Sequence, residues 1–406
     1  MSDPRFPESA ATLRVGVNAL RLVPCTDGRA ESFVRNAVRA LAARFPDDAI
    51  VVFGNRENRM VLAEDLRDFP RVTLVALPVD GALPEKVARC EASRLPRALR
   101  EHRVDVLWNP AGEAPAKAAP CPVVSMAPGV LDPRQTPPAG LFARMARRRA
   151  RARLLREAPV LTTPSEFARQ ELLRRHGIRF NRIAVVPPCA DPVFARPIPA
   201  EVLSDRMMAL LRGADPYLVV VADSHPDAGL PVAVAAFAKL AADLPHRLVL
   251  VGRPGAAEHA LQQAVAALPD PSRVVRLGYV ERFDLAALLQ GAALAIEPSL
   301  RADGALSVLE AMSAGVPVVA TRAGAIPEIG GEALRYVAPG DAEALADAAR
   351  ETVLLPLEER SELVQGQEAR ARKFSPEATA DALMALFRRL AEGERLGHAR
   401  PTPAAG

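Results

Sequence analysis

The sequence predicts an α/β protein made of two doubly wound domains, each a parallel sheet with helices on both faces. Two observations support this. Short apolar segments alternate with helical segments along most of the chain, and that alternation is typical of a parallel sheet. The length of 406 residues, half of them hydrophobic, is sufficient for more than one core.

The composition narrows the functional classes. Basic and acidic residues are interleaved, with a net charge of only +4, so the charge pattern does not favour nucleic-acid binding. The four cysteines lie far apart without C-x-x-C spacing, which favours reduced thiols over disulfides or zinc: Cys25, Cys90, Cys121 and Cys189. No signal peptide and no run of eighteen apolar residues is visible. We therefore expect a cytoplasmic protein that does not span a membrane.

The first domain is predicted at residues 12–195. It opens with a strand at Leu13–Val17, a loop that contains Gly28, and a helix from about Ala30 to Phe45. Further strands are predicted at Ile50–Phe53, Val72–Leu77, Val104–Trp108, Val123–Met126, Val160–Thr163 and Ile183–Val186. Gly28 would let the backbone approach a ligand closely, or it is an ordinary loop glycine, and the sequence leaves both alternatives open.

A basic helix is predicted within this domain at residues 141–156, LFARMARRRARARLLR, with seven arginines. A basic amphipathic helix attracts anionic headgroups, so one interpretation is a peripheral contact with the inner membrane face. The other is a solvated helix face whose arginine stems cover the core. Both interpretations remain open at this point.

The second domain is predicted at residues 215–373, after a proline-rich linker at Pro187–Pro199, and begins with a strand at Tyr217–Val221. A final helix at residues 375–390 has an apolar stripe to bury. The remaining residues, 391–406, are predicted to be a disordered tail.

One strand–loop–helix–strand unit of the second domain predicts a ligand site. A strand at Ala293–Ile296 leads into a loop with Gly304, a helix from about Ser307 to Gly315, and a strand at Val316–Ala320. Ligands of such sheets bind at the carboxyl ends of the strands, and a helix N-terminus favours phosphate. The amides that would bind the anion belong to Ala305, Leu306 and Ser307.

The same segment resembles the donor site of the family-4 retaining glycosyltransferases. The resemblance rests on PSL at Pro298–Leu300, GALSVLEAMSAGVPVVAT at Gly304–Thr321 and AGAIPEI at Ala323–Ile329. It implies the GT-B fold, with two Rossmann-like domains facing across a cleft and the final helix packed back on the first domain. It also implies a UDP- or GDP-linked sugar donor, no metal or other cofactor, and a glycan, lipid or small-molecule acceptor. The sequence contains no D-x-D motif, and this absence counts against the alternative, metal-dependent glycosyltransferase fold.

The resemblance also implies which residues contact the donor. They are Gly28, Val280, Gly304, Ala305, Leu306, Ser307 and Glu310. In the family, the backbone around Val280 receives the base, and the carboxylate at Glu310 binds the ribose. An alternative for Glu310 is a capping box with Ser307, in which the carboxylate serves only its own helix.

Several positions depart from the family pattern. The usual Glu, His, Arg and Lys are replaced by Ala302, Ala127, Asp223 and Ala228. Arg301 and Asp303 are then the candidate catalytic residues, with Arg301 as the phosphate cation and Asp303 standing in for the missing Glu. A second hypothesis is a catalytically impaired relative that supports an active partner enzyme. A third, a sugar-nucleotide epimerase of related fold, is disfavoured by the close match to the donor segment.

Overall fold

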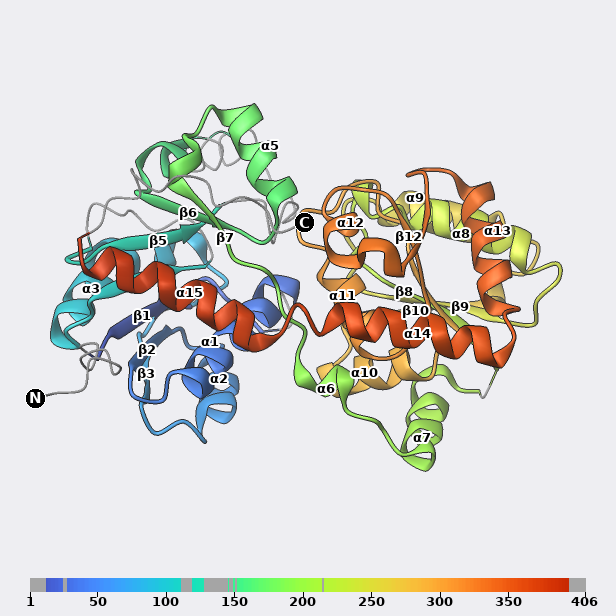
Figure 1. Ribbon diagram of the computed structural model, residues 1–406, viewed down its shortest axis with the longest axis horizontal. Coiled ribbons are helices and arrows are strands. Elements are labelled where there is room, and N and C mark those ends of the chain that lie inside the picture. The colour runs from blue at the N-terminus through green and yellow to red at the C-terminus, as the bar shows by residue number, and fades with distance from the viewer. Residues whose placement is uncertain are drawn as a thin grey trace, which may run out of the picture.

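The computed structural model describes residues 12–24, 28–110, 119–127, 145, 149, 152–213 and 215–393. They form two parallel sheets, each covered by helices, and the sheets lie in two separate lobes (Figure 1). The predicted fold class, two doubly wound α/β domains, is confirmed. The site described below depends on where the strand order of each sheet reverses.

The first sheet has seven strands in the order β3-β2-β1-β4-β5-β6-β7. Their bounds are β1 Arg14–Asn18, β2 Ala49–Gly54, β3 Val72–Ala76, β4 Val106–Asn109, β5 Val123–Met126, β6 Val160–Thr163 and β7 Ile183–Val185. The helices are α1 Gly28–Arg44, α2 Arg59–Leu66, α3 Pro84–Glu101 and α5 Glu166–His176. Most residues of these strands are buried, whichever face of the sheet they lie on, as expected for a covered parallel sheet.

The second sheet has six strands in the order β10-β9-β8-β11-β12-β13. Their bounds are β8 Tyr217–Val221, β9 Arg247–Val251, β10 Val274–Leu277, β11 Leu294–Glu297, β12 Val318–Thr321 and β13 Arg335–Val337. The helices are α8 Leu230–Leu240, α9 Glu258–Ala266, α10 Arg282–Gln290, α11 Leu306–Ser313, α12 Ile326–Gly330, α13 Ala342–Val353 and α14 Leu357–Ala371. The order reverses between β1 and β4 in the first sheet and between β8 and β11 in the second.

The chain crosses between the domains just after β7. Val186 still belongs to the core of the first domain, whereas Phe194 of α6 (Pro192–Ala195) is buried in the core of the second. Met207 and Leu211 of α7 (Ala200–Leu211) lie in that second core as well. The packing therefore places the crossing near the start of the predicted linker, because α6 and α7 supply apolar side chains to the second domain.

The final helix, α15 (Pro376–Ala391), runs back along the first domain (Figure 1). Leu383, Met384 and Phe387 are buried in the same core as α1 and β4, and the rings of Phe387 and Trp108 are 6.4 Å apart. Ser375 caps the helix by accepting a hydrogen bond from the Ala378 amide. Ala391, predicted as the start of the tail, ends this helix, and residues 394–406 lie outside the described residues.

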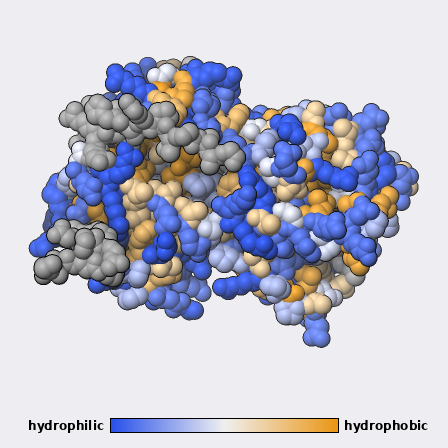
Figure 2. Space-filling view, viewed as in Figure 1, coloured by the Kyte–Doolittle hydropathy of each residue, from blue (hydrophilic) through white to orange (hydrophobic). Residues whose placement is uncertain are grey.

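The basic helix predicted at residues 141–156 lies largely outside the described residues. At its carboxyl end, Leu154 and Leu155 are buried in a small core with residues of β6 and α5. Of the helices in the described ranges, none combines the length and apolar character needed to cross a bilayer. Figure 2 shows hydrophilic residues spread over the visible face of the second domain, with small hydrophobic spots between them.

Candidate functional site

The candidate site lies at the carboxyl ends of β8 and β11, where the order of the second sheet reverses. The loops that follow these two strands pack as one unit. Gly229 has a φ of 67°, and a Cβ there would lie 1.9 Å from the Pro298 carbonyl oxygen, so only glycine permits this approach. The Leu300 amide donates to the Asp227 carbonyl at 2.8 Å.

Ala305, the residue just before α11, has a left-handed conformation, with φ 47° and ψ 38°. This conformation costs an alanine roughly 1–2 kcal/mol, so the surrounding contacts must hold it. Residue 305 is the N-cap and makes no side-chain cap hydrogen bond to the first turn. A helix N-terminus favours an anion, and the anion site at the start of α11 stays a prediction from the sequence.

The buried carboxylate of Glu297, at the end of β11, binds the first turn of α11. Its Oε2 accepts from Ser307 Oγ at 2.5 Å, and its Oε1 accepts from the Ser299 hydroxyl and, at 3.3 Å, from the Ser299 amide. The alternative interpretation of Ser307 and Glu310 as a capping box is wrong, because Ala305 is the N-cap and Ser307 donates to Glu297. Glu310 is buried within α11.

Arg301, the predicted phosphate cation, lies between two carboxylates. Its Nε donates to Asp303 Oδ1 at 3.1 Å, and its Nη2 is 3.4 Å from Glu171 Oε2 on α5 of the first domain. Glu171 also pairs with Arg174 and Arg175. Sequence reasoning missed Glu171 because the contact crosses between domains and has no local signal.

The structure gathers most of the predicted site residues around the start of α11. Arg301, Asp303, Gly304, Ala305, Leu306, Ser307 and Glu310 all belong to that loop and helix. Gly304 lies against Pro164 of the first domain, where a Cβ would be 3.1 Å from the proline ring. Gly28 begins α1, and Val280 lies in the loop between β10 and α10, so these two come from other strand ends.

The structure shows what surrounds three of the residues that the sequence analysis set against the family pattern. Asp223 binds Arg253 after β9, accepting its amide at 2.8 Å and its Nη2 at 2.5 Å. Ala228 is completely buried in the core beneath α8, and Ala127 is buried in the first domain. Position 223 thus holds an ion-paired acid, and positions 127 and 228 hold core alanines.

The first sheet has a polar cluster at its own reversal point. Asn18, at the end of β1, donates to Glu91 at 2.9 Å and to Asn109, at the end of β4, at 3.1 Å. Arg21 pairs with Glu91 at 2.5 Å. Sequence reasoning missed this cluster, although an Asn that ends each of two apolar strands is the signal that would have found it.

Two family models match the chain. The glycosyltransferase family 4 model matches residues 30–194, and the glycosyl transferases group 1 model matches residues 215–353. The chain belongs to the group 1, family-4 glycosyltransferases. The two matches cover the second sheet and every strand of the first sheet except β1, so the resemblance seen in the donor segment extends over most of the chain.

Two named relatives agree with this assignment. The O-antigen chain mannosyltransferase B of Escherichia coli is 28% identical over 194 residues, which are 47% of this chain and 51% of that protein. The MMP alpha-(1->4)-mannosyltransferase of Mycolicibacterium hassiacum is 28% identical over 238 residues, 58% of this chain and 55% of that protein. The chain therefore spans about half the length of these two relatives.

The solved structures support the same fold. HepE of Anabaena, in complex with UDP-glucose, superposes with a TM-score of 0.68 at 17% identity, covering 92% of this chain and 99% of that one. An identity this low shows the fold alone. The predicted GT-B fold is confirmed.

Proposed function

We propose that this glycosyltransferase moves a sugar, with retention of configuration and without a metal ion, from a UDP- or GDP-linked donor to a glycan, lipid or small-molecule acceptor. The donor diphosphate binds at the start of α11, and the acceptor binds on the first domain. Arg301 is the cation that stabilises the departing diphosphate, and Glu310 binds the ribose. Asp303 orients Arg301.

One observation carries this proposal: the helix start at the reversal point of the second sheet, with Arg301 three residues before Gly304. Retaining transfer requires the diphosphate charge to be stabilised as it develops, and oriented amides with a guanidinium do this without a metal. The structural neighbour HepE, solved with UDP-glucose, supports the choice of a nucleoside-diphosphate sugar. The named relatives, which are mannosyltransferases, support sugar transfer.

A second candidate function is that of an impaired relative that supports an active partner enzyme. It is favoured by the engagement of Asp223 with Arg253 and by the burial of Ala127 and Ala228. Assays of UDP- and GDP-sugar hydrolysis separate the two functions. A slow transferase releases some free sugar and nucleotide, whereas the supporting protein releases none.

The role of Arg301 is tested by calorimetric titration of UDP and GDP into wild type and Arg301→Ala. A charge-assisted contact contributes about 1.5–3 kcal/mol, but Arg301 must give up part of its pairing with Asp303 and Glu171 to make it. We therefore expect the affinity of Arg301→Ala for the nucleotide to be roughly tenfold lower than that of wild type. Arg335→Ala, which breaks an exposed pair with Glu351, is the control.

Equal binding by wild type and Arg301→Ala would remove Arg301 from the site. If neither nucleotide binds wild type, the nucleotide-sugar proposal itself is wrong. A loss shared with Arg335→Ala would point to general destabilisation instead of a lost phosphate contact.

A further inference from the structure

The first turn of α5, in the first domain, is bound by a side chain of the second. A helix leaves its first amides without partners inside the helix. In α5 the Ala168 amide bonds to Ser165 Oγ at 3.0 Å. The two preceding amides bond to the carboxylate of Glu328 on α12: the Glu166 amide donates to Oε2 at 2.8 Å, and the Phe167 amide donates to Oε1.

Glu328 is held firmly within the second domain. Arg370 of α14 donates to the carbonyl oxygens of Glu328 and Ile329, at 2.5 and 2.9 Å. Just before α12, the Ala325 amide donates to the Ala302 carbonyl at 2.7 Å. The carboxylate that binds α5 and the loop that bears Arg301 therefore belong to one rigid unit.

The same turn of α5 also contacts the Arg301 loop directly. Ser165 Oγ donates to the Asp303 carbonyl at 2.6 Å, in addition to capping its own helix. One turn of the first domain thus contacts both the donor loop and α12. The two carboxylate oxygens of Glu328 match the two amides.

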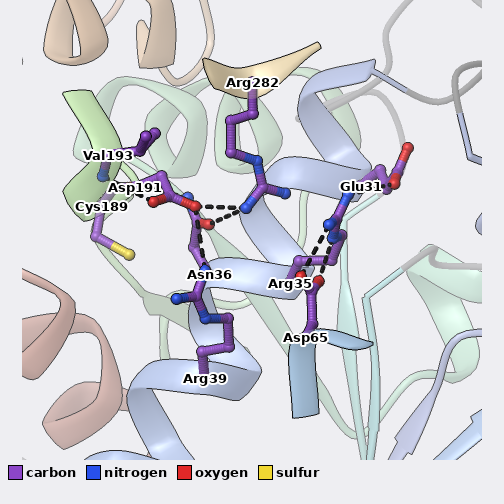
Figure 3. Close-up of polar contacts among 9 residues, drawn as sticks. All are labelled: Glu31, Arg35, Asn36, Arg39, Asp65, Cys189, Asp191, Val193 and Arg282. Atoms are coloured by element: carbon purple, nitrogen blue, oxygen red, sulfur yellow. Dashed lines mark hydrogen bonds and ion pairs between the residues drawn. The ribbon is translucent and has the colours of Figure 1, made fainter. Parts of the chain in front are cut away.

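A different contact joins the domains at the linker. Asp191, the N-cap of α6, pairs with Arg282 of α10 and, at 3.4 Å, with Arg39 of α1 (Figure 3). Asp191 lies on the connecting chain itself, so rotation about the linker leaves it in place. The contact between α12 and α5 contains no linker residue, and it must break if the domains separate.

We propose that Glu328 is a positioning residue for sugar transfer: by binding the first turn of α5, it sets the distance between the acceptor-side domain and the donor loop. The part that concerns transfer rests on the proposed function. The part that concerns the domain contact does not, and it is measured separately.

Hydrogen exchange of the full chain tests the domain contact. In Glu328→Ala the amides of residues 166 and 167 lose their partner, and their exchange should become roughly tenfold faster or more. Glu328→Gln offers one acceptor oxygen in place of two, so its exchange should lie between wild type and Glu328→Ala. The control is Glu332→Ala, which removes a carboxylate four residues later.

Transfer kinetics distinguish positioning from a purely local structural role. Because the donor loop and α11 remain intact, Glu328→Ala should bind donor with a KM within about twofold of wild type, while kcat falls about tenfold. Small-angle scattering should show a larger radius of gyration for the variant. Glu328→Gln should recover part of both changes, and Glu332→Ala should show neither.

The outcomes separate cleanly. Unchanged exchange at residues 166 and 167 in Glu328→Ala overturns the domain contact, and no change in scattering overturns the claim that Glu328 sets the distance between the domains. Faster exchange with unchanged kcat overturns the positioning role and leaves a local cap for α5. A wild type that transfers no sugar contradicts the proposed function and, with it, the kinetic part of this proposal, while exchange and scattering still decide whether Glu328 joins the domains.

Discussion

Replacing Asp191 by Asn tests how strongly the linker contact stabilises the protein. The Asp191 carboxylate is nearly buried, with 6% of its side chain exposed, and it pairs with Arg282, whose side chain is 19% exposed. Figure 3 shows both side chains converging with Asn36 and Arg39 of α1. Asn preserves the shape and caps a helix as well as Asp does, so the α6 cap to Val193 should survive.

The expected loss follows from the burial of the pair. Removing one partner of a buried ion pair costs about 3–5 kcal/mol, because the other charge is left unpaired. Arg282 keeps some access to water, and Arg39 is more than one-third exposed, so about 2–3 kcal/mol is a better estimate here. At about 2–4 °C per kcal/mol for a domain of this size, Tm should fall by about 4–12 °C.

Differential scanning calorimetry measures this shift. The control is Asp381→Asn, which breaks the pair between Asp381 and Arg44, joined at 3.1 Å with each side chain about half exposed. Exposed pairs contribute only about 0.2–1 kcal/mol, so Tm of the control should change by less than about 4 °C. Equal shifts in the two variants would show that burial of the Asp191 cluster adds no stability.

Two further predictions concern buried groups. Glu297→Ala should reduce the free energy of unfolding, measured by chemical denaturation, by about 2–4 kcal/mol. The substitution opens a cavity and leaves the hydroxyls of Ser299 and Ser307 without their acceptor. An effect no larger than that of Glu351→Ala, which removes an exposed carboxylate, would contradict this. Burial raises the pKa of Cys189 to about 11. Alkylation requires the thiolate, so iodoacetamide at pH 8 should modify Cys189 about a hundredfold more slowly in the folded than in the unfolded chain. The rate in the folded chain should increase as pH rises. Equal rates in the folded and unfolded chains would contradict the burial of Cys189.

The sequence predicted those parts of the fold that depend on local patterns. The strand before Glu297 and the helix after Ala305 follow from the period of apolar residues, and their boundaries agree with the structure within about two residues. The predicted amide site at the start of α11 rests on the same pattern, since every strand–loop–helix unit of a parallel sheet places a helix start at the carboxyl edge. These features require no knowledge of distant contacts.

The partners of the site residues could not be predicted in this way. Glu171 reaches Arg301, and Glu328 reaches the first turn of α5, only because the two domains face each other, and residues 171 and 301 are far apart in the chain. Glu297 had a local signal, a carboxylate at the end of an otherwise apolar strand, and such a residue needs buried donors. The capping box failed because the helix begins one residue before Ser307, at Leu306.

The structure also limits which side chains positions 223, 228 and 302 can accept. A lysine at position 228 would have to place its ammonium in the apolar core beneath α8, because Ala228 is completely buried, and an unpaired buried charge is strongly disfavoured. An arginine at position 223 would lie beside Arg253 with no carboxylate between them, since Asp223 is the acid that now holds Arg253. Position 302 differs, because Ala302 is only partly buried and its backbone already binds the amide of Ala325. A glutamate at position 302 is therefore the substitution that the surrounding structure can accept without losing an existing contact.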